Sequence, residues 1–360
     1  MATVLHTESS SGYGGQEIRT LAEVRWLLRH GWGALIACQP ESPLFAEAKA
    51  SEIPVEPFPM RRATDVGALL RLRRLIRDRG VSLVHTHSSV DSWIAGVAAK
   101  SLGRPVVRTR HVSIPIRRRR ALVYRLADRI ITSGESVRSI VIAAGIAPER
   151  VVTISAGVDG DRFHPGVSGR SVRRELGLGE VPVVGLVANV RGSKGHNVFL
   201  DAAGTVLASR PDARFLIVGD GVGFEEVSRR VRQMGLDTSV RLTGFRRDVP
   251  EVMAALDVLV LPSIRSEAIS QVIPQALAVG TPVVASTVGG SPELIRDGEN
   301  GRLVPPGDSR ALADAILSLL RDPERARAMA RAGQTMVRER YTIDATMART
   351  TAVYRELVGA

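Results

Sequence analysis

The apolar residues of this chain lie in short runs that alternate with longer segments of helical periodicity. In the first half, the short apolar runs are residues 2–7, 34–38, 83–87, 106–110, 129–133 and 151–155. The segments whose apolar positions recur every three or four residues are 16–30, 65–79, 90–102, 116–126 and 136–144. Such recurrence indicates one apolar helix face, and the short runs indicate buried strands. The alternation predicts a parallel sheet covered by helices on both faces.

A second series of the same kind follows residues 157–179, where glycine, aspartate and proline are dense and no strand pattern continues. We place the interdomain linker near residues 163–169. The expected strands of this series are 183–188, 215–218, 240–243, 301–304 and the two apolar ends of 259–286; the expected helices are 198–209, 224–234, 250–256, 309–320 and 323–340. We therefore expect domains over residues 1–165 and 166–341, followed by a tail helix within 342–360.

The predicted fold class is α/β, with two doubly wound Rossmann-like domains that face a central cleft. Open parallel sheets of this kind bind their ligands beyond the carboxyl ends of the strands, so the cleft is the expected ligand site. The composition agrees with a globular chain, because 44% of the 360 residues are hydrophobic and 24% are charged. Cys38 is the only cysteine, and no apolar run reaches membrane-spanning length. We expect a cytoplasmic protein that lacks disulfides within the chain.

The formal net charge of +12 comes partly from two arginine clusters in the first half of the chain. The clusters comprise Arg71, Arg73, Arg74, Arg77 and Arg79, and Arg117, Arg118, Arg119 and Arg120. Aromatic residues make up only 4% of the chain and do not interleave with the arginines, which argues against nucleic acid as a partner. A basic helix face suits an anionic membrane surface, and an arginine-rich face in contact with solvent explains the clusters equally well.

Glu267 lies in a loop between two apolar runs, just after the predicted strand that begins at residue 259. Ser270 is expected to cap the helix that follows, whose N–H groups and positive dipole end favour an anion. A carboxylate can hold sugar hydroxyls, so the loop and the helix end together predict a sugar–phosphate ligand. The loop that begins at Asn189 adds Arg191 and Lys194, two cations that can clamp a diphosphate at a helix start.

The first predicted strand is followed by a loop that contains Gly12, Gly14 and Gly15. Glycines there allow a phosphate or sugar to approach the backbone, although a plain turn would use them as well. The full G-x-G-x-x-G fingerprint is absent, so a nicotinamide cofactor is not expected. Three histidines, His85, His87 and His111, end two further strands, and no matching metal-ligand set accompanies them. His111 is the strongest functional candidate of the three.

The order of these segments resembles that of retaining glycosyltransferases of family 4, which have the glycosyltransferase-B fold. The motifs that carry the resemblance are GGQE, VHTH, RTRH, ADRIITSGE, GVDGDRFHP, KGH, FLIVGDG, the Glu267 loop, GTPVVAS with a downstream GG and E, and GRLVPPGD. They extend over nearly the whole chain. The resemblance implies transfer of a sugar from a nucleotide diphosphate sugar, with retained configuration, no metal ion and no further cofactor. It also implies that the tail helix returns to the first domain.

Individual roles follow from the same resemblance. The glycine loop near the diphosphate would be Gly14 and Gly15, and the histidine that contacts the donor sugar would be His111. Lys194 matches the clamp lysine, and Glu267 matches the first acidic residue of the E-x7-E motif.

Three positions depart from the pattern. Gln275 replaces the second acidic residue of that motif, Asn189 replaces the usual arginine before the lysine, and Ala268 replaces a glycine. Gln275 can still hydrogen-bond a ribose, and Arg191 can supply the missing charge.

We therefore expect a metal-independent retaining glycosyltransferase whose catalytic residues are His111 and Glu267. The expected substrate-binding residues are Gly14, Gly15, Asn189, Arg191, Lys194, Ser270 and Gln275. The expected acceptor is a glycan or a lipid-linked sugar of the cell envelope, such as a lipopolysaccharide or polysaccharide precursor, at the inner face of the membrane. Alternatives are a sugar-nucleotide epimerase or glycoside phosphorylase on the same fold, and a non-catalytic sugar-nucleotide-binding paralogue.

Overall fold

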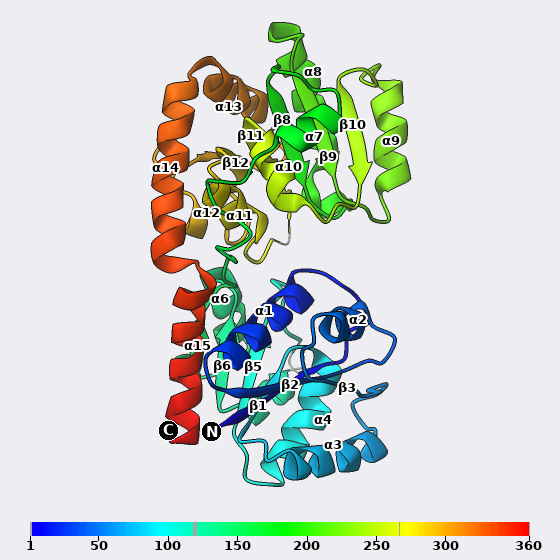
Figure 1. Cartoon of the computed structure of the whole chain (residues 1–360), viewed down its shortest axis with the longest axis vertical. Helices are drawn as coiled ribbons and strands as arrows, with labels where there is room; N and C mark the ends of the chain where they lie inside the picture. Colours follow the sequence, from blue (N-terminus) through cyan, green and yellow to red (C-terminus); the bar gives the residue numbers. More distant parts are fainter. Residues whose placement is uncertain (1, 118–120, 266, 360) are drawn as a thin grey trace. The chain divides into compact units, whose positions relative to one another are not determined.

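The structure is a computed structural model, and it describes residues 2–117, 121–265 and 267–359 (Figure 1). The chain forms two compact units. Unit 1 comprises Met1–Gly157 and Ile343–Ala360, and unit 2 comprises Val158–Thr342. The chain thus enters unit 2 a few residues before the expected linker, and the last helix packs within unit 1.

Unit 1 is built on a parallel sheet of seven strands in the order β3-β2-β1-β4-β5-β6-β7. The strands are β1 (Thr3–Glu8), β2 (Gly33–Cys38), β3 (Val55–Pro57), β4 (Leu83–Thr86), β5 (Val106–Arg110), β6 (Arg129–Thr132) and β7 (Val151–Thr153). β1 pairs in parallel with both β2 and β4. The order of the strands therefore reverses between β1 and β4.

Helices cover both faces of this sheet, as expected for right-handed crossovers. They are α1 (Gly15–Arg29), α2 (Pro43–Ala50), α3 (Val66–Asp78), α4 (Ser89–Lys100), α6 (Glu135–Ala143), α15 (Ile343–Val358) and two 3-10 turns, Leu122–Leu126 and Pro148–Arg150. One apolar cluster joins the sheet to α1, α2 and α15, and another joins the opposite face to α3 and α4. The buried Met347 and Tyr354 anchor α15 in the first of these clusters.

Unit 2 repeats the arrangement with six parallel strands in the order β10-β9-β8-β11-β12-β13. The strands are β8 (Val183–Val187), β9 (Arg214–Val218), β10 (Val240–Gly244), β11 (Val258–Leu261), β12 (Val283–Ser286) and β13 (Arg302–Val304). The helices are α7 (Arg170–Glu175), α8 (His196–Ser209), α9 (Phe224–Gln233), α10 (Val249–Ala255), α11 (Val272–Val279), α12 (Ser291–Leu294), α13 (Ser309–Arg321), α14 (Pro323–Arg340) and a 3-10 turn over Gly192–Lys194. Here the strand order reverses between β8 and β11.

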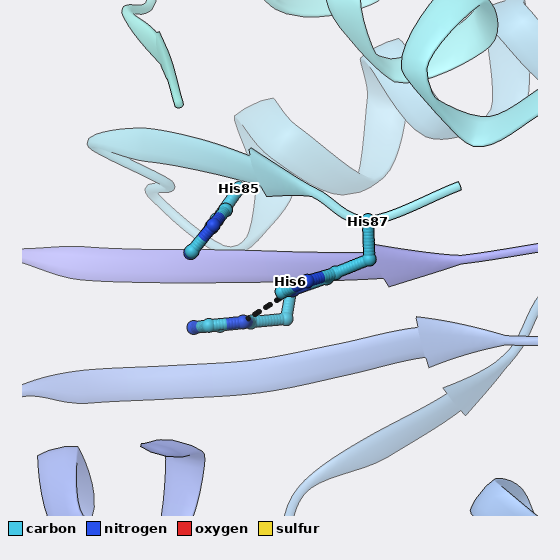
Figure 2. Close-up of side chains that lie close together, drawn as sticks. All are labelled: His6, His85 and His87. Carbon is cyan, nitrogen blue, oxygen red and sulfur yellow. Dashed lines mark hydrogen bonds between the residues drawn. The ribbon is translucent and has the colours of Figure 1, made fainter. Parts of the chain in front are cut away.

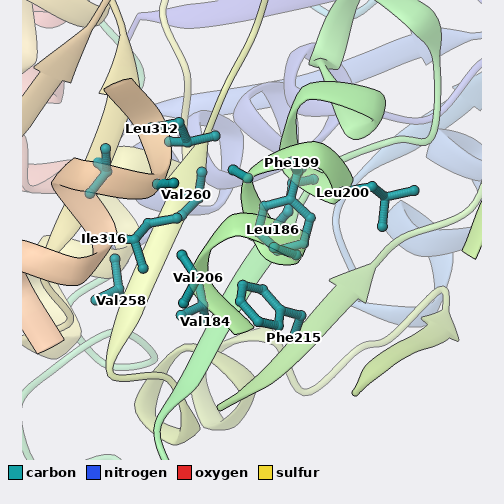
Figure 3. Packing of buried hydrophobic residues seen from close by; sticks show 14 of the residues in the cluster. Val184, Leu186, Phe199, Leu200, Val206, Phe215, Val258, Val260, Leu312 and Ile316 are labelled. Carbon is teal, nitrogen blue, oxygen red and sulfur yellow. The ribbon is translucent and has the colours of Figure 1, made fainter. Parts of the chain in front are cut away.

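The core of unit 2 explains why its strands read as nearly continuous apolar runs. Both faces of the sheet are covered, so successive side chains of one strand enter different clusters. Val184 and Leu186 pack with Phe199 and Phe215 on the face covered by α8 and α13 (Figure 3). Val183 and Val187 pack on the opposite face with residues of α10 and α11. This two-sided burial is typical of parallel sheets.

The α/β fold class predicted from the alternating pattern is confirmed, and the differences from it are local. The predicted helix over 116–126 is confirmed only in part of the described residues: residues 111–117 form no helix, Ala121 is helical, and Leu122–Leu126 form a 3-10 turn. Pro115 disfavours a helical conformation of the residue before it. Arg118, Arg119 and Arg120 lie outside the described residues. Three short elements, α2, β3 and α7, were not predicted because each spans too few residues for a period to show.

Candidate functional site

The strongest constellation lies in unit 2, at the carboxyl ends of the two strands where the strand order reverses. Lys194 follows β8 and lies at the entry to α8, and Glu267 follows β11. The Lys194 ammonium donates to Glu267 Oε2 at 2.6 Å, with side-chain exposures of 13% and 8%. Reversal points of this kind are where open α/β sheets bind ligands. The two residues predicted from separate motifs therefore form one buried ion pair at the expected place.

Glu267 is held from its other side by serines that sequence reasoning missed. Ser263 is fully buried, and its hydroxyl donates to the same Oε2 at 2.7 Å. The Ser286 hydroxyl, at the end of β12, donates in turn to the Ser263 carbonyl oxygen. Both bonds to the carboxylate end on Oε2, so Oε1 takes part in neither. The arrangement fixes the carboxylate and leaves one oxygen for another donor.

The loops that contain Lys194 and Glu267 are held in place by close contacts between backbone segments. The Ile264 N–H donates to the Ser193 carbonyl at 2.9 Å, which joins the Lys194 loop to the Glu267 loop. Gly289 has φ +57°, and a Cβ there would overlap the carbonyl group of Glu267. Gly290 donates its N–H to the Ala268 carbonyl at 2.8 Å. The downstream glycine pair is therefore required by packing against the Glu267 loop.

Replacement of Gly289 by alanine tests this packing. We expect Gly289→Ala to lower the free energy of unfolding by more than about 2 kcal/mol, because the methyl group would displace the backbone of Glu267. Gly298→Ala is the matched control, since Gly298 also has a positive φ, +80°, but a Cβ there would meet no atom within 4 Å. The control should lose only about 1 kcal/mol in urea denaturation. Equal losses in the two variants would contradict the packing role.

The other predicted residues of unit 2 lie in the loop after β8 and at or in α11. Asn189 and Arg191 are exposed in the loop after β8, and Gln275 is half-buried in α11. The prediction that Ser270 caps α11 is wrong: the helix begins at Val272, Gln271 holds the N-cap position, and no side chain caps it. Gln271 already has helical φ and ψ, so the turn closes without a serine bond. Ser270 is nevertheless buried directly before this helix start.

In unit 1, the predicted glycines form the start of α1 next to a buried carboxyl group. Gly14 is the N-cap, and its N–H donates to Glu17 Oε2 at 2.8 Å. A Cβ at Gly14 would meet only that oxygen, at 3.8 Å, so internal packing does not require glycine there. Glu8 ends β1 and accepts hydrogen bonds from Ser88, Gln16 and the Ser10 N–H. Burial and the nearby Asp91 carboxylate raise the pKa of Glu8 to about 8.

Four histidines lie together on one face of the unit 1 sheet. His6 comes from β1, and His85 and His87 come from β4 and its end (Figure 2); His111 directly follows β5. His6 Nδ1 lies 3.0 Å from His87 Nε2, and His87 Nδ1 lies 3.1 Å from His111 Nε2. His85 instead hydrogen-bonds Thr109 and Tyr354, both at 2.6 Å. Sequence reasoning identified three of these side chains but not His6.

Burial keeps these imidazoles neutral. It lowers the pKa of His6 to about 3, with a further contribution from the charge of Arg19, and it lowers the pKa of His85, His87 and His111 well below the ordinary value. The nitrogens of His6, His85 and His87 lie within 4.8 Å of one another, so these side chains are also candidates for a metal ion. Among their six ring nitrogens, however, only His6 Nε2 has no hydrogen-bond partner among the described residues.

The two units match two different family descriptions. Residues 13–162 match the family described as Glycosyltransferase Family 4, and residues 181–322 match the family described as Glycosyl transferases group 1. No helix within the described ranges is both long and apolar enough to cross a bilayer.

Similar proteins agree with these matches. A GDP-mannose-dependent alpha-(1-6)-phosphatidylinositol monomannoside mannosyltransferase of Mycolicibacterium smegmatis is 30% identical over 73% of this chain and 74% of its own. An alpha-D-kanosaminyltransferase of Streptomyces kanamyceticus is 31% identical over 52% of this chain, and the match spans about half, 48%, of that relative's length. The crystal structure of Anabaena Alr3699/HepE in complex with UDP matches with a TM-score of 0.89 and 24% identity, over 99% of this chain and 100% of that one. The chain therefore belongs to the group 1 glycosyltransferases of family 4.

Proposed function

We propose that this protein transfers a sugar from a nucleotide diphosphate sugar to an acceptor hydroxyl with retention of configuration. The single observation that carries the proposal is the buried Lys194–Glu267 pair at the strand reversal of unit 2. A cation for a leaving diphosphate and a carboxylate for sugar hydroxyls are thereby fixed next to each other. Support also comes from the relatives, one of which depends on GDP-mannose, and from HepE, which has been solved with UDP-glucose.

The donor-handling groups follow from the geometry. Lys194 would stabilise the charge that develops on the leaving diphosphate, with Arg191 in the same loop adding a second, solvent-exposed cation. Glu267 keeps Oε1 outside its bonds to Lys194 and Ser263, and this oxygen would accept from a donor-sugar hydroxyl. The start of α11, after Ser270, offers free N–H groups to a phosphate. Gln275 would hydrogen-bond the ribose as donor and acceptor.

Unit 1 would supply the groups around the reacting sugar. His111 would hydrogen-bond the donor sugar from the end of β5, and the backbone at Gly14 and Gly15, with open space beside Gly14, would admit a phosphate or sugar. The acceptor hydroxyl would attack from the side that the diphosphate leaves, and the leaving phosphate would take its proton. No protein nucleophile takes part in this scheme. Because Lys194 provides the positive charge at the diphosphate, we propose transfer without a metal ion.

A donor screen followed by a turnover assay tests the proposal. We expect one class of nucleotide diphosphate sugar to raise the melting temperature, and free nucleotide diphosphate to appear when an acceptor is added. Full activity in the presence of EDTA is expected, and the anomeric configuration of the product should match that of the donor. Nucleotide release that never depends on an acceptor would instead favour an epimerase or phosphorylase.

A non-catalytic role is the second candidate, because Asn189, Gln275 and Ala268 depart from the family pattern. Gln275→Glu separates the two functions. If the protein is an enzyme with an altered ribose contact, the variant changes the KM for the donor and leaves kcat within a fewfold. Donor binding by calorimetry without turnover by either form, across an acceptor panel, would support the binding role.

The acceptor is proposed to be a lipid-linked sugar of the cell envelope, reached through helix α3. Arg73, Arg74 and Arg77 are exposed on this helix, beside Val66 and Leu70, whose exposed fractions are 65% and 57%. A basic surface with protruding apolar side chains suits an anionic headgroup layer. The second arginine cluster adds Arg117, which is exposed.

Loss of two of these charges should weaken membrane binding. We expect Arg74→Ser/Arg77→Ser to reduce binding to vesicles containing anionic lipid by about tenfold or more, at about 1 kcal/mol per charge. The control is Arg338→Ser/Arg340→Ser, which removes two exposed charges from α14 in unit 2. Sedimentation with vesicles at low salt measures the effect. Equal loss in both variants would assign binding to net charge instead of α3.

A further inference from the structure

Three histidines of unit 1, His6, His87 and His111, form a hydrogen-bonded row that ends at His111. Alternate residues of one strand share a face of the sheet, which is why His85 and His87 lie together and why Thr109 and His111 do. His6 pairs with His85 in the β1–β4 register. The row runs from His6 through His87 to His111, while His85 lies against it with ring centroids 4.8 Å from His6 and 4.4 Å from His87. His85 does not bond to His111.

Neutral imidazoles can form such a row with only two proton arrangements. Each ring offers one N–H and one lone pair, so fixing one ring fixes the others. In the inward arrangement His111 donates to His87, His87 donates to His6, and His6 Nε2 keeps a proton. In the outward arrangement His6 Nδ1–H donates to His87 Nε2, and His87 Nδ1–H donates to His111 Nε2. His111 must then carry its own proton on Nδ1.

The surroundings of His6, at the inner end of the row, decide between the inward and the outward proton arrangement. His6 Nε2 is buried and has no partner among the described residues. The inward arrangement would leave an N–H group unsatisfied there, and orphaned buried N–H groups are rare in proteins. The buried, unpartnered nitrogen therefore favours the outward arrangement, in which His6 Nε2 carries only a lone pair.

We propose that His87 is a positioning residue that holds His111 through its Nε2 and fixes it as the Nδ1–H tautomer. The outward N–H of His111 is then a ready hydrogen-bond donor for a sugar oxygen. This inference rests on the proposed function for the part that His111 plays, but the tautomer itself is a property of the free protein. The unpartnered Nε2 of His6 sets the direction of the row, and His87 transmits it.

A metal ion bound by His6, His85 and His87 is the competing use of the same side chains. It would have to break at least one of the two bonds of His87, to His6 and His111, and at least one bond of His85, whose two nitrogens already bond Thr109 and Tyr354. It would also place a second cation near Arg19, which lies buried. The hydrogen-bonded row satisfies more of these nitrogens than the metal would.

Nitrogen NMR of the histidine rings tests the proposal in the native chain. With ¹⁵N-labelled histidine at neutral pH, we expect His111 to show a protonated Nδ1 and an unprotonated Nε2, with His87 in the same tautomer. His111→Gln assigns the signals. A protonated Nε2 on His111 would overturn the proposal. Addition of Zn²⁺ should leave the native signals unchanged; stoichiometric loss of the His6, His85 and His87 signals would show a metal site instead.

Variants of His87 separate positioning from general support of the fold. Asparagine places an amide nitrogen near the position of His87 Nδ1, so His87→Asn should keep the His111 tautomer, whereas His87→Leu should yield a mixture of tautomers. His85→Leu is the matched control, because it removes an equally buried imidazole without a bond to His111. It should leave the His111 tautomer unchanged. A changed tautomer in the His85 variant, or an unchanged one in His87→Leu, would contradict the role of His87.

The kcat of the His87 variants tests the role of His111 in the reaction, and the NMR measurement tests its tautomer independently. If the protein transfers sugars, His87→Leu should reduce kcat by about 10- to 100-fold, and His87→Asn should restore most of it. If no donor is turned over at all, the proposed function fails, while the tautomer measurements still decide whether His87 orients His111. Turnover that is unaffected in His87→Leu would show that the fixed tautomer of His111 has no part in the reaction.

Discussion

Replacement of Lys194 or Glu267 by alanine is expected to reduce sugar transfer by about a hundredfold to a thousandfold or more. Lys194 would stabilise charge on the leaving diphosphate, and loss of one such group commonly costs this much. Each variant also leaves its former partner charged and largely buried, with an exposure of 8% for Glu267 and 13% for Lys194. We therefore expect unit 2 to remain folded but to lose stability.

Isosteric variants separate the loss of chemistry from the loss of stability. Lys194→Met keeps the length of the side chain, and Glu267→Gln keeps the shape of the carboxylate; both should remain nearly inactive with smaller shifts in the urea midpoint. Lys100→Met is the control, because Lys100 forms its ion pair with Asp128, within unit 1. Its kcat/KM should equal that of the unaltered protein.

The combined variant gives the sharpest result. If Lys194 and Glu267 act as one unit, the double variant should be little worse than either single variant, because effects within a catalytic unit are strongly non-additive. Retained turnover in both single variants would contradict the assignment of the site. Additive losses would show that the two side chains act on separate steps despite their 2.6 Å contact.

The two residues of the ion pair, though not their contact, could be anticipated from the sequence because each lies in a loop that follows a predicted strand. Their loops contain turn residues, and the strand pattern places both loops at one edge of the sheet. The alternating apolar runs located the strands to within a few residues because each unit 2 strand is buried on both faces. The resemblance to family 4 then attached roles to Lys194 and Glu267, which composition could not do.

The supporting residues could not be anticipated, because their contacts join distant parts of the chain. Ser263 and Ser286 look like ordinary strand-end serines until β11 and β12 are paired. His6 stands in a short apolar strand, and only the alignment of β1 with β4 brings it to His85. The error at Ser270 has a different cause, the position of a helix start. A shift of the helix start by one residue is below the resolution of sequence patterns, yet it decides which residue caps the helix.

Mild acid is expected to unfold unit 1 well before unit 2. The histidine row is neutral in the folded unit, because the pKa values of His6, His85, His87 and His111 lie below 6.5, that of His6 at about 3. An unfolded chain binds these protons at 6.5. Between the two pKa values the unfolded chain therefore holds more protons than the folded unit, and the free energy of unfolding falls as the pH falls.

Two buried acids oppose this trend. Burial raises the pKa of Glu8 to about 8 and also raises that of Asp91. The folded unit keeps protons that the unfolded chain has lost, so these groups make unfolding harder as the pH falls towards their unfolded pKa values, for Glu8 from about 8. The four histidines outnumber the two acids, so we expect the net effect of acid to be a fall in the free energy of unfolding of unit 1.

The placement of the tryptophans makes the prediction measurable in the intact chain. Trp26, Trp32 and Trp93 all belong to unit 1, so their fluorescence reports that unit alone. Its urea midpoint should fall steeply between pH 6.5 and 4.5, while circular dichroism retains the contribution of unit 2. Glu8→Gln should remove stability gained between pH 8 and 6.5 and steepen the decline below, because one opposing acid is lost. A tryptophan midpoint that is constant from pH 7 to 4.5 would mean that the row is already protonated in the folded unit, which its burial and mutual bonding make energetically unfavourable.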